Sequence, residues 1–226
     1  MNSKLLLADD GVLLVEVAYL SDLLGKNLFD SVYHEHVCYW AVAPIKVFFS
    51  RLGMEIIDVV PVATHGGSIR VLVQKVGGPR RISPHVSATI RHEAKMGLHR
   101  VATYKNFAGR VAQNRTKLTS LLARLRQRGA TIAGYGAPAK STTLLHYFGI
   151  DNQTLVFIVD DSPLKQGLYT PGTHIPVVES TQLYERRPDY VLVLAWNFAQ
   201  SIMQIHNRYH QDGGKFIIPV PRPTIQ

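Results

Sequence analysis

Four consecutive residues bring together the side chains that proton transfer near neutral pH requires. Tyr33, His34, Glu35 and His36 supply a phenol, a carboxylate and two imidazoles. An imidazole changes its charge close to neutral pH and a neighbouring carboxylate can orient it, so such groupings are typical of general acid–base sites. The apolar segment 12–18 before them is expected to be a strand, which predicts that they lie where a strand passes into a loop.

A glycine turn is the second candidate site. Gly134 and Gly136, followed by the small Ala139, match the turn that joins strand to helix in Rossmann folds. Gly134 is expected to permit a tight turn and Gly136 to let the backbone approach a ligand. The following helix N-terminus offers N–H groups to an anion, and Lys140 adds a positive charge. Asp160 ends the next apolar segment at the spacing of a ribose-binding acid, which by itself suggests NAD.

Other interpretations of this turn stay open from the residues alone. It could join strand to helix without binding anything. The stretch also approaches a P-loop, with Lys140 and Ser141 at the expected places, but Ala139 replaces the glycine that a P-loop needs before its lysine.

Two further segments carry polar candidates. Gly66 and Gly67 precede an expected strand in which Arg70 could bind a phosphate or carboxylate with its forked guanidinium group, or lie in solvent beside a tight turn. The proline- and glycine-rich loop 160–176 offers possible ligand contacts, or groups that simply meet water, at Lys165, Gln166 and His174.

A metal site is the alternative for the first motif. His34, His36 and Cys38 would share one face of an extended segment, with His65 as a possible fourth ligand. They lack a well-spaced partner pair, and the apolar and aromatic neighbours of Cys38 suit a buried thiol. We therefore predict no metal site.

The segments that must position these residues form a mixed pattern. Strands are expected at 12–18, 55–60 and 69–75, with a helix at 43–52. Glycines and prolines at 77–84 mark a boundary. Residues 84–128 have helical spacing with breaks at Gly97 and Gly109, and strands and helices alternate from residue 130, which favours an α/β fold with a parallel sheet.

Composition sets independent limits. With 226 residues, 46% of them hydrophobic, the chain can bury a core in one large or two small domains. The single cysteine excludes an intrachain disulfide and fits a reducing cytoplasm. No apolar run reaches membrane-spanning length, and the early acidic residues argue against export. The net charge of +9 is spread along the chain, so we expect solvated helix faces rather than a nucleic-acid site.

Three motifs together resemble the sugar C-methyltransferases, which use S-adenosylmethionine (SAM) to methylate a carbon of a nucleotide-linked keto sugar. The resemblance runs from about residue 5 to about residue 222 and is carried, in the family's order, by the segments 29–40, 64–70 and 134–140. It implies that residues 1–78 are the C-terminal part of a methyltransferase Rossmann sheet. It also implies that residues 79–226 are the family's C-terminal domain, with a helical connector at 84–128 and a second Rossmann-like parallel sheet at 129–226.

The resemblance also implies roles for individual residues. It makes His36 the base, Glu35 the group that orients or tunes it, and Tyr33 a residue that positions the substrate or donates to its oxygen. His34 would face the other way in an extended segment and is taken as structural. The residues that the family places on the sugar-nucleotide side of the cleft or beside it are Gly134, Gly136, Lys140, Ser141, Lys165, His174 and Arg70.

The family's SAM-binding half and zinc-binding module precede the stretch that corresponds to this chain. The resemblance therefore implies that most SAM-binding residues lie outside it, either because the chain is a truncated form or because it docks onto a separate chain. Two rival hypotheses remain: a non-catalytic sugar-nucleotide binding module, and an NAD-dependent oxidoreductase that uses the Gly134 turn and Asp160.

Overall fold

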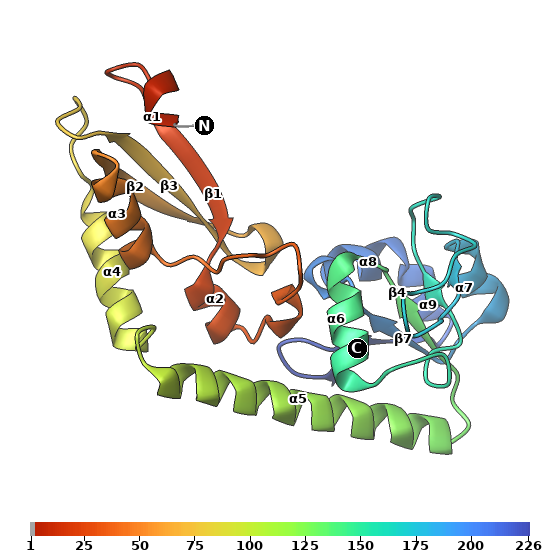
Figure 1. The fold of residues 1–226 in the computed structure, drawn as a ribbon. Helices are drawn as coiled ribbons and strands as arrows, with labels where there is room; N and C mark the ends of the chain where they lie inside the picture. The colour runs from red at the N-terminus through yellow and green to blue at the C-terminus, as the bar shows by residue number, and fades with distance from the viewer. Residues whose placement is uncertain (1–2) are drawn as a thin grey trace. The chain divides into compact units, whose positions relative to one another are not determined.

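The chain crosses between two structural units three times. The computed structural model describes residues 3–226, and its ribbon is shown in Figure 1. Unit 1 consists of Met1–Lys26 and Val37–Phe107, and unit 2 of Asn27–His36 and Ala108–Gln226. The short segment 27–36 is thus an excursion from unit 1 into unit 2. The predicted division into domains at residue 78 stays a prediction.

Unit 1 is built on a three-stranded antiparallel sheet in the order β1-β3-β2 (Figure 1). Alternate apolar residues of β3 are fully buried, including Ile69, Val71 and Val73, and they pack with side chains of α3 and α4. The strands and the helix predicted here are confirmed to within a few residues. The elements of unit 1 are α1 (Ser3–Leu6), β1 (Leu13–Ala18), α2 (Leu20–Gly25), α3 (Val42–Arg51), β2 (Met54–Val62), η2 (Thr64–Gly66), β3 (Ser68–Lys75) and α4 (Pro84–Met96).

The predicted helical stretch 84–128 is two helices, α4 and α5 (Val101–Gln127). Ser83 caps α4 by accepting a hydrogen bond from the His85 backbone N–H, and Gly97 ends that helix in a left-handed conformation, with φ of 70°. The break predicted at Gly109 is wrong, because this residue lies inside α5. Its helix-propensity cost of about 1 kcal/mol is outweighed by the buried residues of the same helix, among them Leu118 and Leu122.

Unit 2 confirms the predicted α/β fold with a mostly parallel sheet. The strand order is β6-β5-β4-β7-β8-β9, and only β9 runs antiparallel to its neighbour. The chain continues from β4 to β5 on one side and later to β7 on the other, so the sheet reverses its winding beside β4. Its remaining elements are η1 (Phe29–Ser31), β4 (Ile132–Tyr135), α6 (Ala139–Phe148), β5 (Ile158–Val159), β6 (Val177–Val178), α7 (Thr181–Arg186), β7 (Tyr190–Val193), η3 (Trp196–Phe198), α8 (Ala199–Ile205), α9 (Asn207–Gln211), β8 (Lys215–Ile218) and β9 (Thr224–Ile225).

Segment 27–36 is held on unit 2 by aromatic packing. The ring of Phe29 stacks on Phe148 of α6 with centroids 5.0 Å apart and lies 5.7 Å from Tyr147. The side-chain amide of Asn27 donates to the Pro221 carbonyl oxygen at 3.4 Å. The residues of the first motif therefore belong to the unit that carries the parallel sheet.

Within the part of the chain that the structure describes, every helix is too short or too polar to cross a bilayer.

Candidate functional site

The first motif forms a turn rather than the end of a strand. The His36 backbone N–H donates to the Tyr33 carbonyl oxygen at 3.0 Å, which closes a four-residue turn just after η1. The expected strand-to-loop junction is therefore wrong, because α2 and η1 lie between β1 and the motif. The turn brings the rings of Tyr33 and His36 to a centroid distance of 4.5 Å, and both side chains are half-buried while His34 and Glu35 are exposed.

A backbone carbonyl selects the tautomer of the neutral His36 ring. The Nδ1 atom of this ring lies 2.7 Å from the carbonyl oxygen of Ser31. A carbonyl oxygen can only accept a hydrogen bond, so Nδ1 carries the proton and Nε2 is the basic nitrogen of the neutral ring. Ser31 belongs to η1, so the position of that short helix determines where the carbonyl that accepts from His36 Nδ1 lies.

The two glycines of the second motif meet the chain's own residues. Gly134 lies inside β4, and a side chain there would approach Ile158 Cγ1 to 2.7 Å. The expected tight-turn role of Gly134 is thus wrong, since its lack of a side chain serves the packing of β4 against β5. Gly136 does adopt a left-handed conformation, with φ of 85°, and a Cβ atom there would lie 2.6 Å from the Cβ of Ala195. The close approach predicted for a ligand is made by the segment that follows β7.

Two polar residues begin α6, and both are buried. Ser141 donates its hydroxyl proton to the Pro138 carbonyl oxygen at 2.7 Å. The Lys140 side chain is turned into the unit, where its Nζ atom has no hydrogen-bond partner and lies 5.7 Å from the centroid of the Trp196 ring. Burial lowers the pKa of Lys140, and the charge of Asp30 partly offsets this effect.

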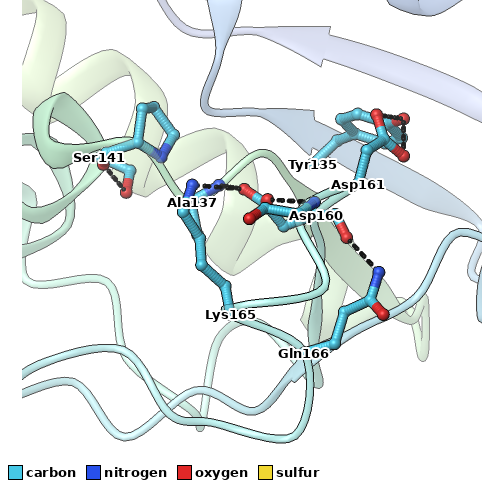
Figure 2. A network of polar contacts seen from close by, with 9 residues as sticks. Tyr135, Ala137, Ser141, Asp160, Asp161, Lys165 and Gln166 are labelled. Atoms are coloured by element: carbon cyan, nitrogen blue, oxygen red, sulfur yellow. Dashed lines mark hydrogen bonds and ion pairs between the residues drawn. The ribbon is translucent and has the colours of Figure 1, made fainter.

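Figure 2 shows how Asp160 anchors the loop after β5. Its carboxylate accepts from the backbone N–H groups of Ala137 at 2.7 Å and Ser162 at 2.9 Å, and it pairs with Lys165 Nζ at 3.1 Å. Burial alone would raise the pKa of Asp160, but these donors outweigh it and lower the pKa. The side-chain amide of Gln166 donates to the Asp160 carbonyl oxygen at 3.0 Å.

This network bears on two hypotheses from the sequence. Lys165 and Gln166, predicted to contact substrate, both hold the loop through Asp160. The Asp160 carboxylate already accepts from Ala137, Ser162 and Lys165, and a dinucleotide ribose would compete with these donors, so the geometry disfavours NAD at this turn.

The last two predicted residues lie elsewhere. His174 is exposed and adopts a left-handed conformation with φ of 50°. Arg70 belongs to unit 1, where its Nε atom pairs with Glu16 Oε2 at 2.8 Å across the β1–β3 register. Unit 2 thus contains every predicted site residue except Arg70.

A second polar network lies at the carboxyl edge of the sheet in unit 2. Tyr135 donates its hydroxyl proton to Asp161 at 2.9 Å and lies 2.8 Å from His206 Nε2, while the Tyr184 hydroxyl lies 2.8 Å from Nδ1 of the same ring. Burial raises the pKa of Tyr135 and lowers that of His206. Figure 2 includes the Tyr135–Asp161 contact.

The residues that sequence reasoning missed most clearly are Asp30 and Trp196. The Trp196 indole N–H donates to Asp30 Oδ2, and Asp30 is completely buried. Nothing local in the sequence indicates this pairing, because the partners come from η1 and η3 and lie far apart in the chain.

The residues of the alternative metal hypothesis do not form a group of metal ligands. Within residues 3–226, no three His, Cys, Asp or Glu side chains gather closely enough to hold a metal ion. Cys38 is exposed, so the expected buried thiol is wrong. It lies in an irregular segment between η1 and α3, and its apolar neighbours in the sequence do not form a core around it.

Comparison with known proteins identifies the family. The family model of the C-methyltransferase C-terminal domain matches residues 63–221. The C-methyltransferase NovU of Streptomyces niveus is 37% identical over 220 residues, which cover 97% of this chain and 52% of that protein. The chain thus spans about half the length of the curated relative that it matches. The chain belongs to the C-methyltransferase family and corresponds to that family's C-terminal portion.

Proposed function

We propose that the chain supplies the base and the substrate-binding residues of a C-methyltransferase that acts on a nucleotide-linked keto sugar. Methylation at carbon needs a nucleophilic carbon, and a ketone provides one when the neighbouring C–H ionises to an enolate. A positioned base must take that proton, and a nearby donor must stabilise the oxygen that becomes negative.

The observation that supports this role is the contact between His36 Nδ1 and the Ser31 carbonyl oxygen at 2.7 Å. With Nδ1 protonated, Nε2 takes the substrate proton, and the ring becomes an imidazolium that still donates to Ser31. The neighbouring Tyr33 ring positions the substrate or donates to the enolate oxygen. In this proposal Glu35 keeps the role of the group that orients or tunes the imidazole.

SAM supplies the methyl group in this family, but the glycine turn of unit 2 does not fit it. The place where a Rossmann fold would bind an adenosyl group is the turn at Gly136, which Ala195 already approaches. The acid that would bind its ribose, Asp160, is engaged by Ala137, Ser162 and Lys165. SAM is therefore held by other residues, on a further region of the protein or on a separate chain.

The test measures removal of the proton next to the ketone, a step that requires no methyl donor. A thymidine-diphosphate keto sugar is incubated with the chain in D₂O, and NMR measures deuterium incorporation at the carbon next to the ketone. The wild-type chain should accelerate exchange, and His36→Gln should slow it by about 100-fold or more, in the range of general-base catalysis.

His34→Gln is the matched control, because it changes the exposed imidazole two residues away and leaves the Ser31–His36 contact in place. It should retain most of the exchange rate. Exchange by the wild-type chain no faster than in buffer, or equal rates for the wild type and His36→Gln, would refute the proposed base.

A further inference from the structure

A buried polar cluster lies where η1, α6 and η3 meet within unit 2. Asp30 has no exposed surface and Lys140 is 9% exposed. The Trp196 indole N–H donates to one carboxylate oxygen of Asp30, and the ammonium group of Lys140 lies over the indole ring. The second oxygen of Asp30 and the Nζ atom of Lys140 make no hydrogen bond.

Burying these two charges is unfavourable for each of them. Burial raises the pKa of Asp30, which the Trp196 hydrogen bond and the charge of Lys140 partly counteract. Burial likewise lowers the pKa of Lys140. A buried charge persists only where an opposite charge or a strong hydrogen bond compensates it. For Asp30 the compensation is the Trp196 N–H together with the charge of Lys140, and the Lys140 ammonium group lies over the same indole ring. The enclosed ammonium group is therefore suited to holding Asp30 rather than to meeting a ligand in solvent.

The cluster lies directly before the residues that orient His36. Asp30 precedes Ser31, whose carbonyl oxygen accepts a hydrogen bond from His36 Nδ1. The ring of Phe29 stacks on Phe148 of the helix that carries Lys140. Contacts of two consecutive residues, Phe29 and Asp30, thus hold η1 in place. The position of η1 in turn places the Ser31 carbonyl oxygen, which selects the tautomer of His36.

We propose that Asp30, Lys140 and Trp196 form a latch that holds η1 against unit 2 and thereby positions His36 with Nδ1 protonated. The role of the latch in catalysis rests on the proposed function, in which His36 is the base. Lys140 and Asp30 act here as positioning residues through Ser31, without touching the substrate.

The test uses signals that do not depend on catalysis. In the intact chain labelled with ¹⁵N, the shifts of the two His36 nitrogens report which of them carries the proton. Lys140→Met removes the positive charge at similar side-chain length, so the buried Asp30 loses that compensation and keeps the hydrogen bond from the Trp196 N–H. We expect this variant to mix the two His36 tautomers and to raise amide hydrogen exchange over residues 27–36 by at least about tenfold, the change produced by about 1.4 kcal/mol.

The double variant Asp30→Asn/Lys140→Met separates a latch from general damage. It leaves no uncompensated charge and keeps an oxygen for the Trp196 N–H, so it should recover most of the protection lost in Lys140→Met. Lys165→Met is the matched control, because that lysine pairs with Asp160 in the same unit and should leave the His36 shifts unchanged.

Unchanged His36 shifts and unchanged protection of residues 27–36 in Lys140→Met would overturn the proposal. So would a double variant no better protected than Lys140→Met. If His36→Gln leaves substrate exchange intact while Lys140→Met still alters the tautomer, the latch stands and the base assignment fails, so the two ideas are tested separately.

Discussion

At Gly136 two physical requirements coincide in one residue. Its backbone has a φ of 85°, and a Cβ atom would lie 2.6 Å from Ala195 Cβ. Gly136→Ala should lower the free energy of unfolding by about 2–5 kcal/mol, since a left-handed conformation costs an L-residue about 1–2 kcal/mol and overpacking adds about 1–3 kcal/mol. Urea unfolding followed by circular dichroism measures the change.

Gly129 provides the matched control for Gly136. Its φ is 80°, but an added Cβ would meet no atom within 4 Å, so Gly129→Ala should cost only the backbone part, about 1–2 kcal/mol. Adding Ala195→Gly to Gly136→Ala should relieve the contact and leave a similar backbone cost. Equal losses for Gly136→Ala and Gly129→Ala would show that the approach of Ala195 has no energetic weight.

Among the helices of unit 1, α3 depends on a carboxylate from another helix. Its N-cap residue, Ala41, has no capping side chain, and Glu93 of α4 accepts from the backbone N–H groups of Val42 at 2.6 Å and Ala43 at 3.0 Å. Because Glu93 is buried and also accepts from the Tyr19 hydroxyl at 3.1 Å, it satisfies donors that would otherwise remain without partners.

Glu93→Gln should therefore destabilise unit 1 by about 2–3 kcal/mol. The amide keeps a single acceptor oxygen, loses the charge that favours the helix N-terminus, and directs N–H groups at other donors. Thermal and urea unfolding measure the loss. Tyr19→Phe removes only one of the three bonds and should cost about 1 kcal/mol; a Glu93→Gln loss no greater than that would contradict the capping role.

These elements also show what local sequence could predict. The strand at 69–75 and the helical stretch 84–128 depend on the pattern of neighbouring residues, and both were predicted correctly apart from the break at Gly109. The parallel sheet followed from the alternation of strands and helices after residue 130.

The errors arose where distant residues decide the structure. Gly134 was assigned to a turn, but Ile158 determines its role. The motif at 33–36 was expected beside a strand, but Asp30 and Phe29 carry it onto unit 2. Neither the Asp30–Trp196 pair nor the cap from Glu93 has a local signature, because each joins residues that only the folded chain brings together.

For the whole chain, acid should unfold the protein through its carboxylates. The carboxyl groups whose pKa is lowered in the folded chain are Asp9, Glu16, Asp58, Asp160 and Asp189. A lowered folded pKa means that the unfolded chain binds more protons, so these groups contribute stability above about pH 4 that is lost as pH falls through their folded values. Asp30 acts in the opposite sense, because its pKa is raised. The urea concentration at the unfolding midpoint should therefore decrease as the pH is lowered from 6 to 3.

The chain carries a net charge of +9 at pH 7, and its positive charge grows as the pH falls, so repulsion between charges also opposes folding in acid. A variant of one carboxylate separates this repulsion from the effect of protonating carboxylates. Asp160→Asn should cost about 1.5–3 kcal/mol at pH 6, where it removes a charged acceptor from three donors. At lower pH the unfolded wild-type chain binds a proton at this carboxyl before the folded chain does, so the difference between the two proteins should shrink toward pH 3. Repulsion acts on both nearly alike, and the exposed Glu179→Gln should show little change at either pH. A difference for Asp160→Asn that is equal at pH 6 and pH 3 would mean that the ionised Asp160 does not stabilise the fold.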